Sequence, residues 1–228
     1  MDLKMKSKNT GKKLMKKNKL YLIKKEILEE AKKIIIDKGW NSKLFYLISK
    51  RNKFKLQEIN LLFPNGYLDL LKFYLEELNF EMINYTKKLD LNKMKLHQRI
   101  RNILILRLEK NEKNKKLIKR TFLILFLPKH FKIATSSLYK TVDLIWFIAK
   151  DKSTDFSFYS KRAILSKIYI LTIMHWINNE RLSETVNFLD KQLINVSKIP
   201  LVKAKVKNTF SKFPMLLNFI NFFPKSMR

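Results

Sequence analysis

The chain has no cysteine, only 3 glycines and 5 prolines among 228 residues, and no long apolar run. Without cysteine it has neither a disulfide scaffold nor a thiolate metal site, which is consistent with a reducing compartment. No apolar stretch approaches the roughly 20 residues that cross a bilayer, and the N-terminus lacks the apolar core of a secretory signal. The lysine-rich start is a poor organelle transit peptide. These absences predict a bacterial cytoplasmic protein.

Acidic residues are also scarce, 19 against 49 Lys and Arg, which gives a net charge of +30. Residues 1–20 carry eight Lys against Asp2, and residues 198–228 carry seven Lys or Arg and no acid, so the two ends hold +14 of the total. The abundance of Lys, Asn, Ile and Phe is also what an AT-rich genome produces by codon bias. The remaining charge favours an anionic membrane surface or nucleic acid as a partner.

The residues that catalysis needs are not grouped. No glycine-rich phosphate loop, cysteine nucleophile or nucleophile elbow is present. The carboxylate pairs Glu29/Glu30 and Glu76/Glu77 are adjacent in sequence, so they diverge on a helix. The histidines stand on different predicted helices, without metal-ligand spacing: His97, His130 and His175. The sequence therefore predicts a protein that is not an enzyme and has no metal or catalytic residue.

The few helix breakers and the helical spacing of apolar residues predict an all-α fold. Residues 1–18 are expected to be a disordered basic tail. A stripe of Ile23, Ile27, Ala31 and Ile34 predicts the first helix, which ends at Gly39. Asp90 and Ser183 are predicted helix caps. The helices are expected at 20–38, 42–51, 56–62, 67–87, 91–110, 113–127, 130–149, 155–178 and 184–196. Arg107 is expected to point outward, and Ala163 and Ile164 are expected to be mostly buried.

Three helices followed by Phe63-Pro-Asn-Gly resemble the helix-turn-helix entry of TetR-type proteins. In a DNA reader the third helix enters the major groove. Here that helix offers Gln57, Glu58 and Asn60, and a carboxylate opposes phosphate, although Lys53 and Lys55 flank it. A DNA-binding transcriptional regulator of TetR type stays open as the alternative function.

Two further apolar segments stand out. Residues 121–127 are apolar on every helical face, so other helices or a ligand must enclose them, and they are expected to form the central helix of the second half. Five Lys precede a C-terminal amphipathic helix that begins near Lys212. Such a helix favours a membrane interface, although it can also dock on its own body or on a partner subunit. Its apolar face comprises Phe213, Leu216, Leu217, Ile220 and Phe223.

Aromatic residues are concentrated around the polar turn between the helices predicted at 130–149 and 155–178. Trp146 closes the first helix, and Asp155 stands in the first turn of the second, where the helix dipole favours a carboxylate. Phe156, Phe158 and Tyr159 point about 100° apart and cannot all be buried. An aromatic corner with one acid indicates a docking patch rather than a catalytic centre.

The motif Thr141-Val-Asp143-x-x-Trp146, followed by Asp151-x-Ser-Thr-Asp155-Phe-x-x-Tyr159-x-Lys-Arg-Ala163, resembles the signature of an accessory family of ubiquinone biosynthesis called coenzyme Q nine. The resemblance runs from about residue 19 to 197. It implies a TetR-like fold with a C-terminal lipid-binding half. It also implies that the protein presents an isoprenoid quinone precursor to the di-iron hydroxylase of that pathway.

By this resemblance the hydroxylase-docking patch comprises Asp143, Ile145, Trp146, Asp155, Phe158 and Tyr159. The sequence departs from the family at Phe158, usually Trp, and at Ser157, usually Asn. Candidate lipid-binding residues, which core packing explains equally well, are Leu104, Leu108, Phe122, Leu123 and Phe126. Implied partners are the hydroxylase, the lipid (a quinone precursor or a phospholipid) and a second subunit; nucleic acid is not favoured.

These expectations divide the chain into a basic tail at 1–18, a helix-turn-helix-like region at 19–88, a lipid-binding region at 89–197 and a membrane-binding tail at 198–228. The protein is expected on the cytoplasmic face of a bacterial inner membrane, or in mitochondria if the source is eukaryotic. A membrane-surface protein without cargo stays open as a third possibility.

Overall fold

The computed structural model describes the backbone of residues 2–51, 54–151 and 156–198, and the side chains of residues 18–51, 54–151 and 158–195. Every regular element in these ranges is helical, which confirms the predicted all-α class. The α-helices are α1 Asp2–Lys38, α2 Leu44–Ser49, α3 Leu56–Leu62, α4 Tyr67–Thr86, α5 Leu96–Lys110, α6 Lys115–Leu125, α7 Phe131–Ile148, α8 Phe156–Asn178 and α9 Leu182–Lys198. Short 3-10 turns occupy η1 Leu91–Lys93, η2 Glu112–Asn114 and η3 Pro128–His130.

The predicted helices match these bounds to within a few residues, with one large exception. α1 begins at Asp2, so the predicted start at residue 20 was too late and the expected disordered tail is helical in its backbone. Lys, Met and Leu, which make up most of this segment, are good helix formers, and no proline interrupts it. Gly39 ends α1 as predicted, with a φ of +69°.

The chain divides into two compact units. Unit 1 comprises residues 1–81 and 111–133, and unit 2 comprises residues 82–110 and 134–228. This division differs from the predicted boundary near residue 88, because α6 packs with the N-terminal helices. The expectation that residues 121–127 form the central helix of the second half was therefore wrong.

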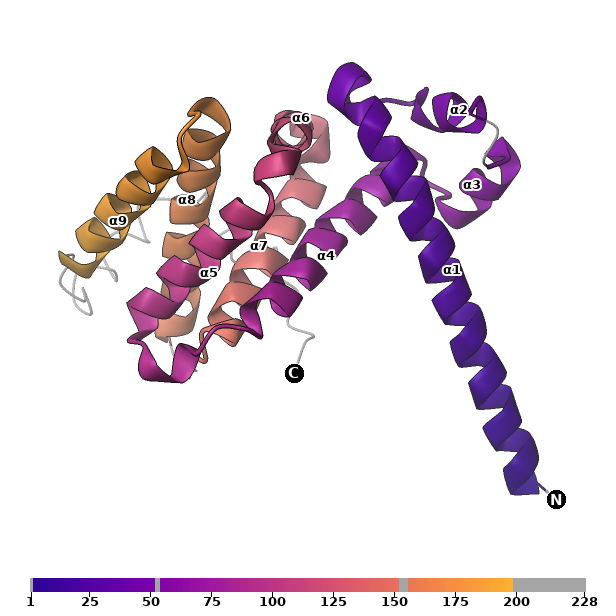
Figure 1. Cartoon of the computed structure of the whole chain (residues 1–228), viewed down its shortest axis with the longest axis horizontal. Helices are drawn as coiled ribbons and strands as arrows, with labels where there is room; N and C mark the ends of the chain where they lie inside the picture. The colour runs from indigo at the N-terminus through magenta and orange to yellow at the C-terminus, as the bar shows by residue number, and fades with distance from the viewer. Residues whose placement is uncertain (1, 52–53, 152–155, 199–228) are drawn as a thin grey trace. The chain divides into compact units, whose positions relative to one another are not determined.

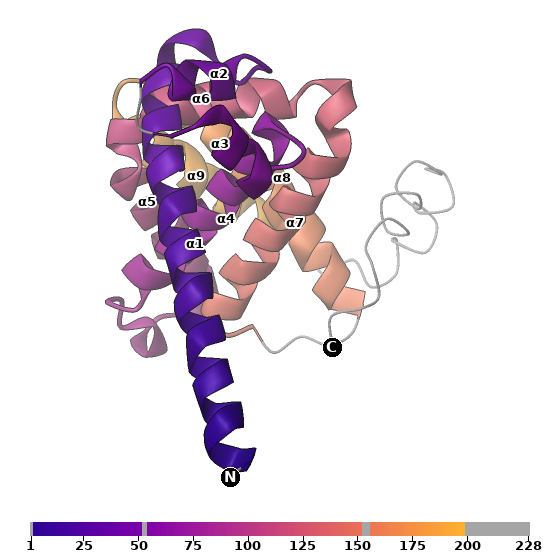
Figure 2. The ribbon, with the colours of Figure 1, turned by 90° about the vertical axis from the view of Figure 1, so that its right-hand side faces the viewer.

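Unit 1 is built around one buried face of α1. Ile27, Ala31 and Ile34 of the predicted stripe are buried, and Phe63 from the turn after α3 joins the same core. In Figure 2, α2 and α3 lie beside the C-terminal part of α1. Trp40 fixes α6 to this core, because its indole Nε1–H donates to Thr121 Oγ1 at 3.0 Å.

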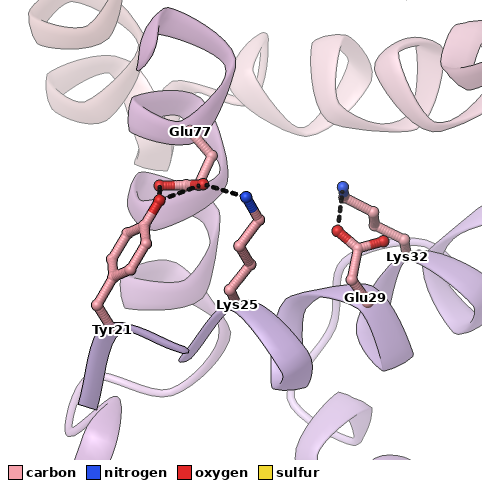
Figure 3. Close-up of polar contacts among 5 residues, drawn as sticks. All are labelled: Tyr21, Lys25, Glu29, Lys32 and Glu77. Carbon is pink, nitrogen blue, oxygen red and sulfur yellow. Dashed lines mark hydrogen bonds and ion pairs between the residues drawn. The ribbon is translucent and has the colours of Figure 1, made fainter. Parts of the chain in front are cut away.

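A partly buried polar contact joins α1 to α4 (Figure 3). The Tyr21 hydroxyl donates to both carboxylate oxygens of Glu77, at 2.8 and 2.9 Å, and Lys25 Nζ lies 3.7 Å from the same carboxylate. Burial, the hydrogen bond to Glu77 and the negative charge of that carboxylate raise the pKa of Tyr21 to about 12. The Glu29–Lys32 pair in the same view joins two residues of α1 alone.

Unit 2 packs α5, α7, α8 and α9 around an apolar core that includes Ile103, Ile145 and Leu189. Figure 1 shows α9 alongside α8, and α9 also contacts α5. The guanidinium of Arg101 on α5 holds the carboxylate of Asp190 on α9 in a two-bond ion pair, at 2.5 and 2.8 Å. Because both bonds fix the planar guanidinium, they set the register of α9 on α5.

Some predicted side-chain directions were wrong. Arg107, expected to point outward, is buried and donates to the Tyr169 hydroxyl at 3.1 Å. Ala163 and Ile164, expected inside, are exposed, and Leu165 is buried instead. The two expected caps also differ: Asp90 precedes a 3-10 turn without a side-chain cap bond, and Ser183 lies inside α9, which begins one residue earlier.

Candidate docking site at the α7–α8 corner

The site begins where α7 ends, in unit 2. Lys150 has a φ of +59°, which closes the helix in the left-handed conformation, and the Asp151 N–H donates back to the Trp146 carbonyl at 3.1 Å. The Arg99 guanidinium of α5 donates to the Ala149 carbonyl at 3.0 Å. Because a side chain from another helix binds this terminal carbonyl, the end of α7 has a fixed position in unit 2.

The side chain of Arg162, on the first turns of α8, links the two helices. Its Nε donates to Asp143 Oδ1 on α7 at 2.7 Å, and a terminal nitrogen donates to the Phe158 carbonyl at 3.2 Å. The guanidinium carbon lies 3.2 Å from the centre of the Phe158 ring. A largely buried cation is thus balanced by one carboxylate and one aromatic face.

A second cation binds the base of the same corner. Lys161 Nζ donates to Asp151 Oδ1 at 2.8 Å and lies 5.6 Å from the centre of the Trp146 ring. Trp146 is buried, and within the described residues its indole Nε1 has no hydrogen-bond partner. The Trp146 side chain is therefore a buried packing residue of the corner and is not exposed to a partner.

The exposed part of the corner is aromatic. The Tyr159 side chain is 51% exposed and meets the Phe158 ring edge-on at 5.2 Å, and Phe147 is 77% exposed. Phe147, Asp143 and Tyr139 follow one another at intervals of four residues, so they share one face of α7. Burial and then the negative charge of Asp143 raise the pKa of Tyr139, while Arg162 opposes them. We call Tyr139, Asp143, Phe147, Phe158, Tyr159 and Arg162 the aromatic corner.

The structure brings together four of the six predicted docking residues. Asp143, Trp146, Phe158 and Tyr159 meet at this corner, whereas Ile145 is fully buried in the core of unit 2. Asp155 lies outside the described residues. Sequence reasoning missed Phe147, although its four-residue spacing from Asp143 would have placed it on the same helical face.

The candidate lipid-binding residues do not form one group. Leu104 and Leu108 are buried in α5 of unit 2. Phe122, Leu123 and Phe126 lie at the end of α6 in unit 1, where Leu123 and Phe126 are more than half exposed. Of the two expected enclosures, the described helices do not cover these two side chains, and enclosure by a ligand stays a prediction. The predicted membrane-binding residues lie outside the described part of the chain.

Within residues 2–51, 54–151 and 156–198 the structure holds no helix long and apolar enough to span a membrane. Among the same residues, no three His, Asp or Glu side chains are grouped as metal ligands. His130 is buried in unit 1, where its Nε2 lies 3.5 Å from the Tyr67 hydroxyl. His97 is exposed, and His175 stacks on Phe188 with ring centres 4.5 Å apart. The three histidines therefore do not form a common site.

The helix order and packing define an all-α protein with a TetR-like fold. A solved structure, described as the TetR transcriptional regulator from Nitrosomonas europaea ATCC 19718, matches with a TM-score of 0.63 at 18% identity, over 77% of this chain and 98% of that one. At this identity the likeness shows the fold alone. The TetR-like fold predicted from the sequence is thereby confirmed.

The family resemblance is confirmed over a particular segment: residues 131–200 match the model of the COQ9 family, which is the coenzyme Q nine family named above. Over 92 residues the chain is 34% identical to the ubiquinone biosynthesis protein COQ9, mitochondrial, of Rattus norvegicus and 33% identical to that of Homo sapiens. Each match covers 40% of this chain and about 30% of the relative. The segment that the family model matches, residues 131–200, contains the whole aromatic corner.

Proposed function

We propose that the chain is a non-catalytic accessory protein of ubiquinone biosynthesis, which binds an isoprenoid quinone intermediate and presents it to the di-iron hydroxylase of that pathway at a membrane. The family match at residues 131–200 supports the pathway. The relatives that match the chain over 92 to 108 residues are named as ubiquinone biosynthesis proteins.

The aromatic corner is the observation that carries the docking part of this proposal. Tyr159 and Phe147 are large exposed side chains, and large, rigid aromatic residues supply much of the binding energy of protein interfaces. The helix ends that carry them are held in place by the Arg162–Asp143 contact and by the capped end of α7. A surface that is already ordered loses little conformational entropy when a partner binds.

The cargo part follows from the physical chemistry of an isoprenoid tail. Each CH₂ that leaves the bilayer for water costs about 0.8 kcal/mol, so a carrier must replace the membrane with apolar side chains. Unit 2 holds the family segment from residue 134 onward, together with Leu104 and Leu108, the candidate lipid residues of its interior. We place the lipid in unit 2 for this reason.

Replacement of Tyr159 by Ala tests the docking part. The Tyr159→Ala variant should bind the purified hydroxylase about tenfold or more weakly, because one exposed aromatic anchor is worth about 2 kcal/mol at an interface. Its thermal unfolding should match the wild type, since the side chain is half exposed. Biolayer interferometry and a thermal melt measure the two quantities.

Tyr46→Ala is the matched control, because Tyr46 is 49% exposed on α2, far along the chain from the corner. It should bind the hydroxylase as the wild type does. Equal loss in both variants, or no loss in Tyr159→Ala, would contradict docking at the aromatic corner.

A DNA-binding regulator is the second candidate, and the α2–α3 pair of the TetR-like fold favours it. The side chain of Glu58 opposes it. This carboxylate accepts the Lys55 N–H at 3.3 Å and so stands in the first turn of α3, where a DNA reader would meet phosphate or bases. Sequence-specific duplex binding that survives about 200 mM salt would establish the regulator, because purely phosphate-driven binding fades there.

A further inference from the structure

Unit 1 presents a group of exposed apolar side chains where α6 ends and α7 begins. Leu123 is 54% exposed, Phe126 60%, Leu127 43% and Phe131 56%. They fall within nine residues around the η3 turn. We call these four side chains the apolar ridge.

The helix α6, which leads into the ridge, is packed on the core of unit 1. On the opposite face of α6, Leu117 and Thr121 are buried, and Thr121 accepts the hydrogen bond from Trp40. The Phe122 and Phe126 rings pack with their centres 4.6 Å apart. His130, inside the η3 turn, is buried. The core of unit 1 therefore already uses the inward face, and the ridge side chains point away from it.

The charged residues next to the ridge in the sequence have one sign. Residues 113–142 contain eight Lys or Arg and no Asp or Glu. Lys119, Lys129 and Lys132 stand within four residues of a ridge side chain, and all three are exposed. Apolar side chains among cations match the interface of an anionic bilayer, where acyl chains lie beneath negative headgroups. A protein partner that makes only apolar contacts would not require exclusively positive charge beside the ridge.

We propose that the apolar ridge inserts into the headgroup region of an anionic membrane and that Lys119, Lys129 and Lys132 bind its phosphates. This contact goes beyond the proposed function, since it requires neither a lipid cargo nor the hydroxylase. In sequence it is also separate from segment 213–223, for which a membrane contact is predicted, so the proposal adds a second contact to that prediction.

The absence of cysteine permits a direct test in the full chain. Single-cysteine variants Phe126→Cys and Phe131→Cys carry an environment-sensitive fluorophore, and vesicles contain either phosphatidylcholine alone or phosphatidylcholine with about one third phosphatidylglycerol. With the anionic vesicles both labels should shift to the blue and be quenched by brominated acyl chains. Leu61→Cys on α3, where the native side chain is 81% exposed, is the control and should do neither.

An Ile220→Cys label reports on the C-terminal segment in the same experiment. If the label at 220 enters the bilayer while those at 126 and 131 stay in water, the ridge is not a membrane contact. The proposal is also overturned if no label responds to anionic vesicles. It fails as well if the labels at 126 and 131 are shielded before vesicles are added, because another segment or a second copy then covers the ridge.

A binding measurement complements the labels. The Phe126→Ser/Phe131→Ser double variant should lower the partition onto anionic vesicles about tenfold, because two aromatic side chains no longer enter the interface. Tyr46→Ser/Leu61→Ser, two exposed apolar positions of the same unit, should leave it unchanged. Equal partition of the ridge variant and the wild type contradicts the proposal.

Discussion

At the scale of single residues, Asp143 has a structural role that the sequence did not indicate. The family resemblance places it in the docking surface, and the structure shows its carboxylate bound to Arg162. Arg162 is nearly buried, while the Asp143 side chain is 43% exposed. The carboxylate therefore neutralises an interior cation and orients the corner from within.

Asp143→Asn should lower the free energy of unfolding by about 1–2 kcal/mol, because it leaves a buried guanidinium without its counter-charge, while solvent screens part of the pair. Urea unfolding measures this loss. A variant as stable as the wild type would mean that Arg162 is balanced by other groups. Tyr159→Ala, in contrast, should affect docking without affecting stability.

His130 gives unit 1 a pH dependence. Burial, together with the positive charge of Lys129, lowers the pKa of this imidazole below its ordinary value near 6.5. Between the folded and the unfolded pKa, the unfolded chain binds more protons than the folded one. Stability from His130 is therefore fully present above about pH 6.5 and is lost as the pH falls toward the folded pKa.

The urea concentration at the unfolding midpoint should therefore decrease when the pH is lowered from 7.5 to 5.5. The decrease should be smaller in His130→Gln, which cannot take up the proton. The measurement compares the change in the urea midpoint between pH 7.5 and pH 5.5 in the wild type with the same change in His130→Gln. An equal fall in both would assign the pH dependence to other groups.

At the scale of elements, two glycines set the ends of helices in unit 1. Gly39 after α1 and Gly66 before α4 have φ values of +69° and +64°, and an added Cβ would meet no atom within 4 Å at either place. Alanine at these sites is strained by its backbone conformation alone. These turns direct the chain into α2 and α4.

Gly39→Ala should cost about 1 kcal/mol of unfolding free energy, from the left-handed backbone and not from a clash. Lys38→Ala, at the exposed last residue of α1, is the control and should change stability by less than about 0.5 kcal/mol. Chemical denaturation checks both. No difference between the two variants would mean that the turn relaxes at no cost.

Local patterns predicted the elements, and tertiary packing decided the details that they missed. Apolar periodicity and the Gly and Pro breaks were enough to locate the helices from residue 20 onward. Periodicity treats every Arg as an outward residue, so it could not predict the buried Arg107 that meets Tyr169 from another helix. A composition rule likewise assigned a tail to residues 2–18, where helix formers extend α1.

The candidate site shows the same limit. The motif at 141–163 located the corner because its residues are close in sequence. The roles within it depend on contacts across the turn: Arg162 binds Asp143 across 19 residues, and Arg99 reaches Ala149 across 50. A sequence pattern gives no sign of such partners, so it could not separate the buried Trp146 from the exposed Phe147.

At the scale of the whole molecule, the proposed function uses three segments of different chemistry. The aromatic corner lies in unit 2 and the basic apolar ridge in unit 1. The cationic C-terminal segment, predicted from sequence, lies beyond the described residues. A carrier that takes an insoluble lipid from a bilayer and hands it to an enzyme needs both a membrane contact and a docking surface. A lipid cargo would give the membrane contact and the docking surface a common purpose.

Native mass spectrometry of the full chain, purified from membranes of cells that make ubiquinone, tests that claim most directly. We predict a retained species whose mass and fragmentation identify an isoprenoid quinone precursor, present in the wild type and in Tyr159→Ala alike, because docking is not needed for loading. Protein that arrives without lipid, or with phospholipid alone, would contradict the account.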